Sequence, residues 1–271
     1  MSEAAPIPAE LRALADKTAS GTQQRMAKME WQGRRVWLKK AVPPKATHWT
    51  RLQGFVSFIM PLSILRPTSS PGGAEGLRIE AWRIGEFRRA GFPAPEVLAM
   101  TDGWLVLEDL GDMVERKLQK DTSLSPDAIT DIICDCAEAV AKLHKAGLAH
   151  GRAKLNDMTL MKDGTIGFID FEEDIDAGGI PPHALKARDL WLFLCTVAHF
   201  EKQCPGIIEE AYESYLEIYR DEKVLRALKK LLRLFSPLRY ILWPFHKALG
   251  NDFERAYAAT TTLIRYKKPV T

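Results

Sequence analysis

Apolar positions alternate or cluster in short runs along the first 110 residues, a pattern that predicts strands. Four strands are predicted in two pairs, each pair joined by a glycine-containing turn, at residues 26–40 (two strands around Gln32-Gly33), 97–100 and 104–107. One helix is predicted between the pairs, over residues 75–90, and it should end at Gly91. The first part of the chain is therefore expected to be rich in strands.

Helical spacing dominates the remaining residues, as in 125–146, where Ile129, Ile133 and Val140 recur on one face. Further helices are predicted near 183–201, 206–220, 222–235 and 237–248, and short strands at 158–161 and 166–171. The pattern predicts an α+β fold with a strand-rich N-lobe at about 1–108 and a helical C-lobe at about 109–271.

Composition adds little to the predicted architecture but indicates the cellular compartment in which the protein is expected. A 46% apolar and 27% charged chain is typical of a globular protein, and a net charge of +3 predicts no strong overall field. The first twenty residues lack the features of a secretory signal, and the longest apolar-rich run, 55–65, is too short to span a bilayer. We therefore expect a cytoplasmic protein. Its four cysteines are predicted to be buried free thiols.

Positive charge is concentrated in two segments. Residues 41–74 contain no acidic residue and carry a predicted amphipathic helix, which we interpret as an insertion; residues 223–250 contain seven Lys or Arg and no Asp or Glu. The apolar faces of these helices can be core, with the charges in solvent. They also suit peripheral contact with the inner face of the cell membrane or with an anionic lipid or glycolipid. No nucleic acid is expected, because the aromatic residues lie on the apolar faces.

Four motifs carry candidate chemistry, and their order matters more than any one of them. They are Val36-Trp37-Leu38-Lys39 on a strand, Glu80 in the following helix, Leu107-Glu108-Asp109-Leu110 between the two parts, and HGRAKLNDM (150–158) followed by Ile169-Asp170-Phe171-Glu172. This series resembles the protein-kinase-like superfamily, in particular its divergent bacterial branch near the lipopolysaccharide-core (Kdo/heptose) kinases and the small piD261-type atypical kinases.

The resemblance implies binding of ATP and Mg²⁺. Lys39 would hold the α- and β-phosphates and pair with Glu80, unless a register shift gives this role to Lys40. Glu108 and Leu110 would contact the nucleotide. Asp157 and Asp170 would hold the metal through carboxylate oxygens. His150 and Asp189 would have structural roles, with Asp189 bracing the 150–158 loop.

The sequence departs from this family at the centre of the site. Arg152 stands where a catalytic aspartate is expected, Glu172 replaces a glycine, and Ser20-Gly21-Thr22 is all that corresponds to a phosphate-covering loop. Arg152 could contact the transferring phosphate or an anionic acceptor.

The leading hypothesis is an ATP- and magnesium-dependent phosphotransferase acting on an envelope sugar, glycolipid or lipid, with Arg152, Asp157 and Asp170 as its catalytic residues. The alternatives are a pseudokinase that binds nucleotide or a partner, and a protein Ser/Thr kinase.

Overall fold

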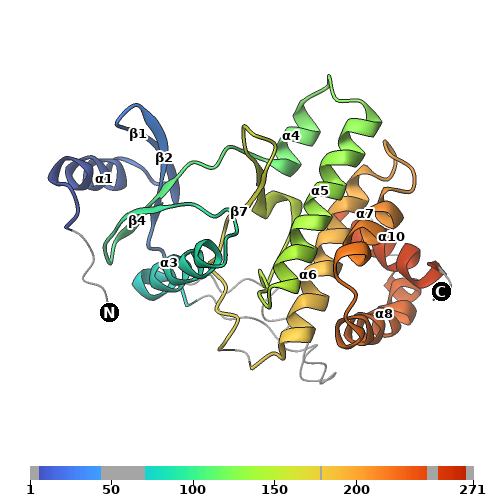
Figure 1. Ribbon diagram of the computed structural model, residues 1–271. Coiled ribbons are helices and arrows are strands. Elements are labelled where there is room, and N and C mark those ends of the chain that lie inside the picture. The colour runs from blue at the N-terminus through green and yellow to red at the C-terminus, as the bar shows by residue number, and fades with distance from the viewer. Residues whose placement is uncertain (1–5, 44–70, 178, 243–249, 267–271) are drawn as a thin grey trace.

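The computed structural model describes residues 6–43, 71–177, 179–242 and 250–266. The predicted basic amphipathic insertion at about 41–74 therefore lies largely outside the described residues. The described residues form a strand-rich N-terminal region and a helical C-terminal region (Figure 1). This confirms the predicted fold class, whereas the exact boundary near residue 108 stays a prediction.

A four-stranded antiparallel sheet forms the N-terminal region. Its strands are β1 (Met26–Trp31), β2 (Arg34–Lys40), β3 (Val97–Met100) and β4 (Trp104–Glu108), in the order β1-β2-β4-β3. The turn between β1 and β2 is the predicted one, since Gln32 and Gly33 both have positive φ angles, 50° and 71°. Successive residues of β4 alternate between the two faces of the sheet, so each face contributes to a different apolar cluster.

Helix α1 (Ala9–Gly21) covers one face of the sheet and was not predicted. Leu11 and Ala15 pack with Val36 and Leu38 in the smaller apolar cluster. Ser20 and Gly21 therefore end a helix, and the expectation that Ser20-Gly21-Thr22 is a reduced phosphate-covering loop was wrong. A helix with only two buried residues, Leu11 and Ala15, has a weak sequence signal, and its stability comes from packing on the sheet.

Helix α3 (Gly73–Arg89) lies on the other side of the sheet, where the sheet meets the helical region (Figure 1). Leu77, Ile84 and Phe87 on this helix join Leu105 and Leu107 of β4 in the larger apolar cluster. Glu80 and Arg83 are on the same buried side. The helix thus carries two charged side chains into the region between the sheet and the C-terminal helices.

The helical region contains a small second sheet, β5-β6-β7. The described elements of the helical region, in chain order, are β5 (Asp112–Met113), α4 (Val114–Lys120), α5 (Pro126–Lys145), η2 (Leu155–Asp157), β6 (Met158–Leu160), β7 (Ile166–Phe168), α6 (Pro182–Val197), η3 (Ala198–Phe200), α7 (Ile207–Ile218), α8 (Glu222–Leu242) and α10 (Asn251–Arg265). Strand β7 is shorter than predicted, and helices α4 and α10 were not predicted. One helix, α8, passes through Pro237, where the sequence predicted a break.

Helix α8 uses its apolar side for the core. Val224, Leu228 and Leu232 are buried, whereas Lys223 and Lys230 are exposed. This supports the interpretation of α8 as a core helix with a solvated basic face. Among the described residues, no helix is both long and apolar enough to cross a bilayer. All four cysteines are free thiols; three are buried and Cys134 is partly buried.

Candidate functional site

Lys39 and Glu80 form the buried ion pair that the motif order predicts. The Lys39 Nζ lies 2.7 Å from Glu80 Oε2, 3.3 Å from Asp170 Oδ1 and 3.6 Å from Glu172 Oε1. The side chains of Lys39 and Glu80 are only 4% and 2% exposed, so the pair is shielded from water. Burial opposes the charge of Lys39, but the three carboxylates raise its pKa, so Lys39 is a cation.

Lys40 has a different role. Its side chain points to the end of α1, where Nζ donates to the carbonyls of Ala19 (2.7 Å) and Thr22 (2.8 Å). A cation at the carboxyl end of a helix satisfies carbonyls that lack intrahelical partners. Of the two lysines that the sequence left open, Lys39 is therefore the one placed among the site carboxylates.

Asp189 on α6 fixes the shape of the 150–158 loop, the bracing role expected for it. Its Oδ2 accepts hydrogen bonds from the backbone N–H groups of His150 (2.7 Å) and Gly151 (3.0 Å), and its Oδ1 accepts one from Ala153 N–H (3.0 Å). Burial alone would raise the pKa of this carboxyl, but hydrogen bonding and charge from His144 and the backbone bond from Ala153 lower it to about 2.

His150 is also structural. The ring is buried, and its Nε2 lies 2.9 Å from the carbonyl oxygen of Ile169, which ties the loop to the segment that carries Asp170. Burial, together with the charge of Arg83, lowers the pKa of His150 to about 4. A neutral imidazole in this position is consistent with the structural role expected from the sequence.

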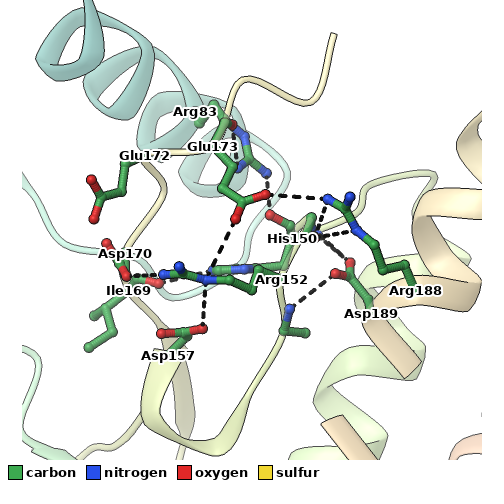
Figure 2. A network of polar contacts seen from close by, with 12 residues as sticks. Arg83, His150, Arg152, Asp157, Ile169, Asp170, Glu172, Glu173, Arg188 and Asp189 are labelled. Atoms are coloured by element: carbon green, nitrogen blue, oxygen red, sulfur yellow. Dashed lines mark hydrogen bonds and ion pairs between the residues drawn. The ribbon is translucent and has the colours of Figure 1, made fainter. Parts of the chain in front are cut away.

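Two arginines that the sequence did not assign to the site hold the same loop (Figure 2). Arg83 donates to the carbonyls of Ala149 (2.9 Å), His150 (3.0 Å) and Glu173 (3.2 Å). Arg188 donates to the carbonyl of Gly151 from both Nε (2.9 Å) and Nη2 (2.6 Å). The sequence offered one clue, since Arg83 follows Glu80 by three residues and so shares its helix face.

Arg152 lies among three carboxylates (Figure 2). Its Nη2 is 2.5 Å from Asp170 Oδ2, and its Nε is 3.6 Å from Asp157 Oδ2 and 3.7 Å from Glu173 Oε1. Burial opposes the charge of the guanidinium, but these carboxylates raise the pKa of Arg152. The side chain brings a fixed positive charge to the position where a catalytic aspartate was expected.

Asp157 and Asp170 differ in their environments although both contact Arg152. Burial, with the charge of Asp170 adding to it, raises the pKa of Asp157 to about 8, although Arg152 acts in the opposite direction. Burial also disfavours the charge of Asp170, but Lys39, Arg152 and a hydrogen bond hold its pKa well below the usual range. Asp170 has a positive φ angle of 66°, which few residues other than glycine adopt and which often marks a functional site.

Glu172, which replaces the expected glycine, forms an ion pair with Arg25 near the start of β1. The Arg25 Nη2 is 2.5 Å from Glu172 Oε2, and Glu172 also lies near Lys39. No sequence signal pointed to this pair, because 147 residues separate its members. The link therefore joins the strand region to the segment after β7.

Glu108 and Leu110, expected to contact the nucleotide, lie at the end of β4 and just after it. The Glu108 carboxylate accepts from the N–H of Glu96 (3.2 Å), and Leu110 is buried. Asp109 lies between them and accepts from the indole N–H of Trp37 (3.0 Å), two residues before Lys39 on β2. Whether Glu108 and Leu110 contact a nucleotide stays a prediction.

The residues present do not fit the magnesium site that the resemblance implied. Mg²⁺ requires oxygen ligands at about 2.0–2.1 Å in octahedral geometry. Asp170 Oδ2 instead accepts a hydrogen bond from Arg152 Nη2, and Asp157 Oδ2 lies 3.6 Å from Arg152 Nε without a hydrogen bond. In the described parts of the chain, no group of three or more His, Cys, Asp or Glu side chains is arranged to hold a metal ion.

The chain matches no protein-family model. It is similar to an uncharacterized protein of Haemophilus influenzae, with 24% identity over 90% of this chain and 92% of that protein. A segment is 33% identical to a "probable serine/threonine-protein kinase BUD32 homolog" of Archaeoglobus fulgidus, over 35% of this chain and 43% of that protein. Another is 32% identical to a "probable bifunctional tRNA threonylcarbamoyladenosine biosynthesis protein" of Methanocorpusculum labreanum, over 41% of this chain and 20% of that protein.

Among solved structures, a MAP kinase of Leishmania major is similar, with 15% identity, a TM-score of 0.41, and coverage of 92% of this chain and 85% of that one. Over 35% and 41% of its length, respectively, this chain is thus similar to the two archaeal proteins, and the Lys39–Glu80 pair is present where the resemblance to kinase-like proteins placed it. None of these proteins carries the name of a lipopolysaccharide-core kinase, so the likeness to that branch stays a prediction.

Proposed function

We propose that this kinase-like protein binds a nucleoside triphosphate beside Lys39 but does not transfer its phosphoryl group. The observation that carries the proposal is the position of Arg152, which stands in place of the catalytic aspartate and lies 2.5 Å from Asp170. Phosphoryl transfer depends on metal cations at the phosphates and on a residue that orients the attacking hydroxyl. A guanidinium engaged by Asp170 cannot accept a proton and leaves that carboxylate poorly available to a metal.

Lys39 supports the nucleotide-binding part of the proposal. Glu80 orients its charged ammonium, while the more distant Glu172 is the partner that a phosphate could replace. The Arg152 side chain, 34% exposed, would offer a second contact, because a planar guanidinium suits phosphate oxygens. The phosphates would then pair with the positive charges of Lys39 and Arg152, which the carboxylates neutralise when no nucleotide is bound.

The proposal is tested by measuring binding and transfer on the same protein. A fluorescent ATP analogue should bind, and Lys39→Met should weaken binding at least tenfold, whereas Arg34→Ala, at an exposed position on the same strand, should not. Because Lys39→Met leaves Glu80 buried without its cation, the double variant Lys39→Met/Glu80→Leu provides a folded alternative. Incubation with γ-labelled ATP and Mg²⁺ should label no protein, lipid or sugar fraction. Absence of binding would refute the nucleotide-binding part.

An ATP- and magnesium-dependent phosphotransferase is the second candidate. It is favoured by the positive φ angle of Asp170, because backbone in this region often marks a functional site and nucleotide binding beside Lys39 does not require it. Arg152 would then turn from the carboxylates toward the transferring phosphate. Label that enters any fraction and disappears in Asp170→Asn would establish this candidate and overturn the proposal.

The fraction that is labelled would identify the class of acceptor of such a phosphotransferase. Label in lipid or glycolipid would support the envelope acceptor and the peripheral position at the inner membrane face, which rest on the basic segments at 41–74 and 223–250. Label in protein would indicate a Ser/Thr kinase instead.

A further inference from the structure

The Arg152 guanidinium occupies the position between the two carboxylates that were expected to share a metal ion. It contacts Oδ2 of Asp170 through Nη2 and faces Oδ2 of Asp157 through Nε (Figure 2). A divalent ion that bridged these two oxygens would overlap the guanidinium. It would also place its two positive charges beside the positive charge of Arg152. A metal ion and the Arg152 side chain in this conformation therefore exclude each other.

The backbone on both sides of Arg152 is held in place, so the side chain extends from a fixed position beside the carboxylates. Asp189 accepts from the N–H groups of Gly151 and Ala153, and Arg188 donates twice to the Gly151 carbonyl. Gly151 has a φ angle of 90°, and a Cβ added there would lie 2.6 Å from the Ile175 side chain. Only glycine fits before Arg152, and the loop has little freedom to rearrange.

The charges around Arg152 are also balanced by residues of the chain itself. Asp170 lies between two cations, Lys39 at 3.3 Å and Arg152 at 2.5 Å. Glu173 lies between Arg152 at 3.7 Å and Arg188 at 3.3 Å. Asp170 and Glu173 are thus each paired with two cations without a divalent ion, whereas Asp157 Oδ2 and Arg152 Nε are buried without a hydrogen bond.

From this geometry we infer that Arg152 is a built-in cation that takes the place of the divalent metal between Asp157 and Asp170. The native protein then binds no Mg²⁺ at this position, and removal of the Arg152 charge opens a two-carboxylate cation site at Asp157 and Asp170, with water completing the coordination. The inference concerns the metal alone. Its extension, that nucleotide binding does not require Mg²⁺, rests on the proposed function.

The first test follows the thermal unfolding midpoint in EDTA and in MgCl₂ or MnCl₂. The native protein should show the same midpoint in all three. Arg152→Ala should unfold at a lower temperature in EDTA and recover on the order of 5 °C at metal concentrations about a hundredfold above the dissociation constant. Arg152→Gln, which keeps hydrogen-bonding atoms near the carboxylates, serves if the alanine variant does not fold. Arg89→Ala, an exposed arginine on α3, is the matched control and should gain no metal response.

Two outcomes would overturn the inference. The native protein is stabilised by Mg²⁺ and loses this response in Asp170→Asn, in which case the metal and Arg152 coexist. Alternatively, neither Arg152 variant gains a metal response that Asp170→Asn removes, in which case the carboxylates form no metal site even when the guanidinium is absent.

A second measurement separates this inference from the proposed function. The affinity for the ATP analogue should be the same in EDTA and in Mg²⁺. Binding that appears only with Mg²⁺ would refute this extension while leaving nucleotide binding intact. Absence of binding under both conditions would refute the proposed nucleotide binding, whereas the metal response of the Arg152 variants would still stand on its own.

Discussion

At the scale of single residues, the shape of the 150–158 loop does not depend on the side chain at position 152. Asp189 and Arg188 hold the loop through backbone atoms of His150, Gly151 and Ala153. A change at position 152 therefore alters the charge of the site while the loop keeps its path. This separation explains how the loop accommodates an arginine where an aspartate was expected.

Buried His150 makes the stability of the protein depend on pH. Its pKa is about 4 in the folded state and close to 6.5 when exposed, so the unfolded chain binds more protons between these values. The His150 contribution to stability is thus complete above pH 6.5 and falls as the pH drops toward 4, by about 3 kcal/mol at most. Asp157, whose pKa is raised to about 8, acts with the opposite sign, because the folded state binds its proton as the pH falls below 8. The His150 loss should therefore be read as the difference between the native protein and a His150 variant, each unfolded in urea at pH 7.5 and pH 5.

The variant His150→Gln, which can still donate to the Ile169 carbonyl, should lose less stability over the same interval. His144, whose pKa burial also lowers, contributes with the same sign and Asp157 with the opposite sign, and both contributions are common to the native protein and the variant. An equal loss in the native protein and in the variant would show that His150 is not the titrating group.

The sequence allowed the Lys39–Glu80 pair to be predicted, because each member lies in a short motif at a recognisable place between strands and helix. The partners of Glu172 and Arg152 could not be predicted in the same way. Arg25 reaches Glu172 across 147 residues, and whether Arg152 points to a phosphate or to Asp170 depends on side-chain geometry that no spacing encodes.

At the scale of elements, α3 is tied to the rest of the site by charged side chains as well as by apolar packing. Glu80 binds Lys39 on the sheet, and Arg83 binds the carbonyls of Ala149, His150 and Glu173. The helix therefore links the sheet to the loop at two points one turn apart. Such double attachment should hold α3 in one position.

Removal of the second attachment should loosen α3 selectively. Arg83→Leu leaves three carbonyls without this donor, and each buried unsatisfied group costs about 1–3 kcal/mol, so we expect a stability loss of at least about 3 kcal/mol. Hydrogen exchange should become faster in α3 and in residues 148–152. Arg89→Ala on the exposed face of the same helix should change neither property. Unchanged exchange in α3 after Arg83→Leu would show that apolar packing alone positions the helix.

Elements with a strong local signal were predictable, whereas those stabilised mainly by tertiary contacts were not. The hairpin at Gln32-Gly33 and helix α5, with Ser125 as its N-cap, carry such signals. Helix α1 has two buried residues, Leu11 and Ala15, and depends on the sheet beneath it. At Pro237 the error was the opposite one, because a break was predicted and α8 continues through this residue.

At the scale of the whole molecule, the main core crosses the predicted boundary near residue 108. Leu77, Ile84, Phe87, Leu105 and Leu107, all before the boundary, share one apolar cluster with residues from α5, α6 and β7. The ion pairs of the site cross the same boundary, since Lys39 and Arg25 bind Asp170 and Glu172. The two regions thus stabilise each other.

This shared core predicts that neither half folds alone. Separate chains of residues 1–108 and 109–271 should lack a sharp urea transition, because each exposes one side of the cluster. The full chain should unfold in a single cooperative step. Circular dichroism monitors unfolding in each case. Co-expression of both fragments should restore a soluble complex, which controls for poor expression of either one. A cooperative transition in the isolated 1–108 fragment would show instead that the sheet, α1 and α3 form an independent domain, and the smaller cluster beneath α1 would then be its core.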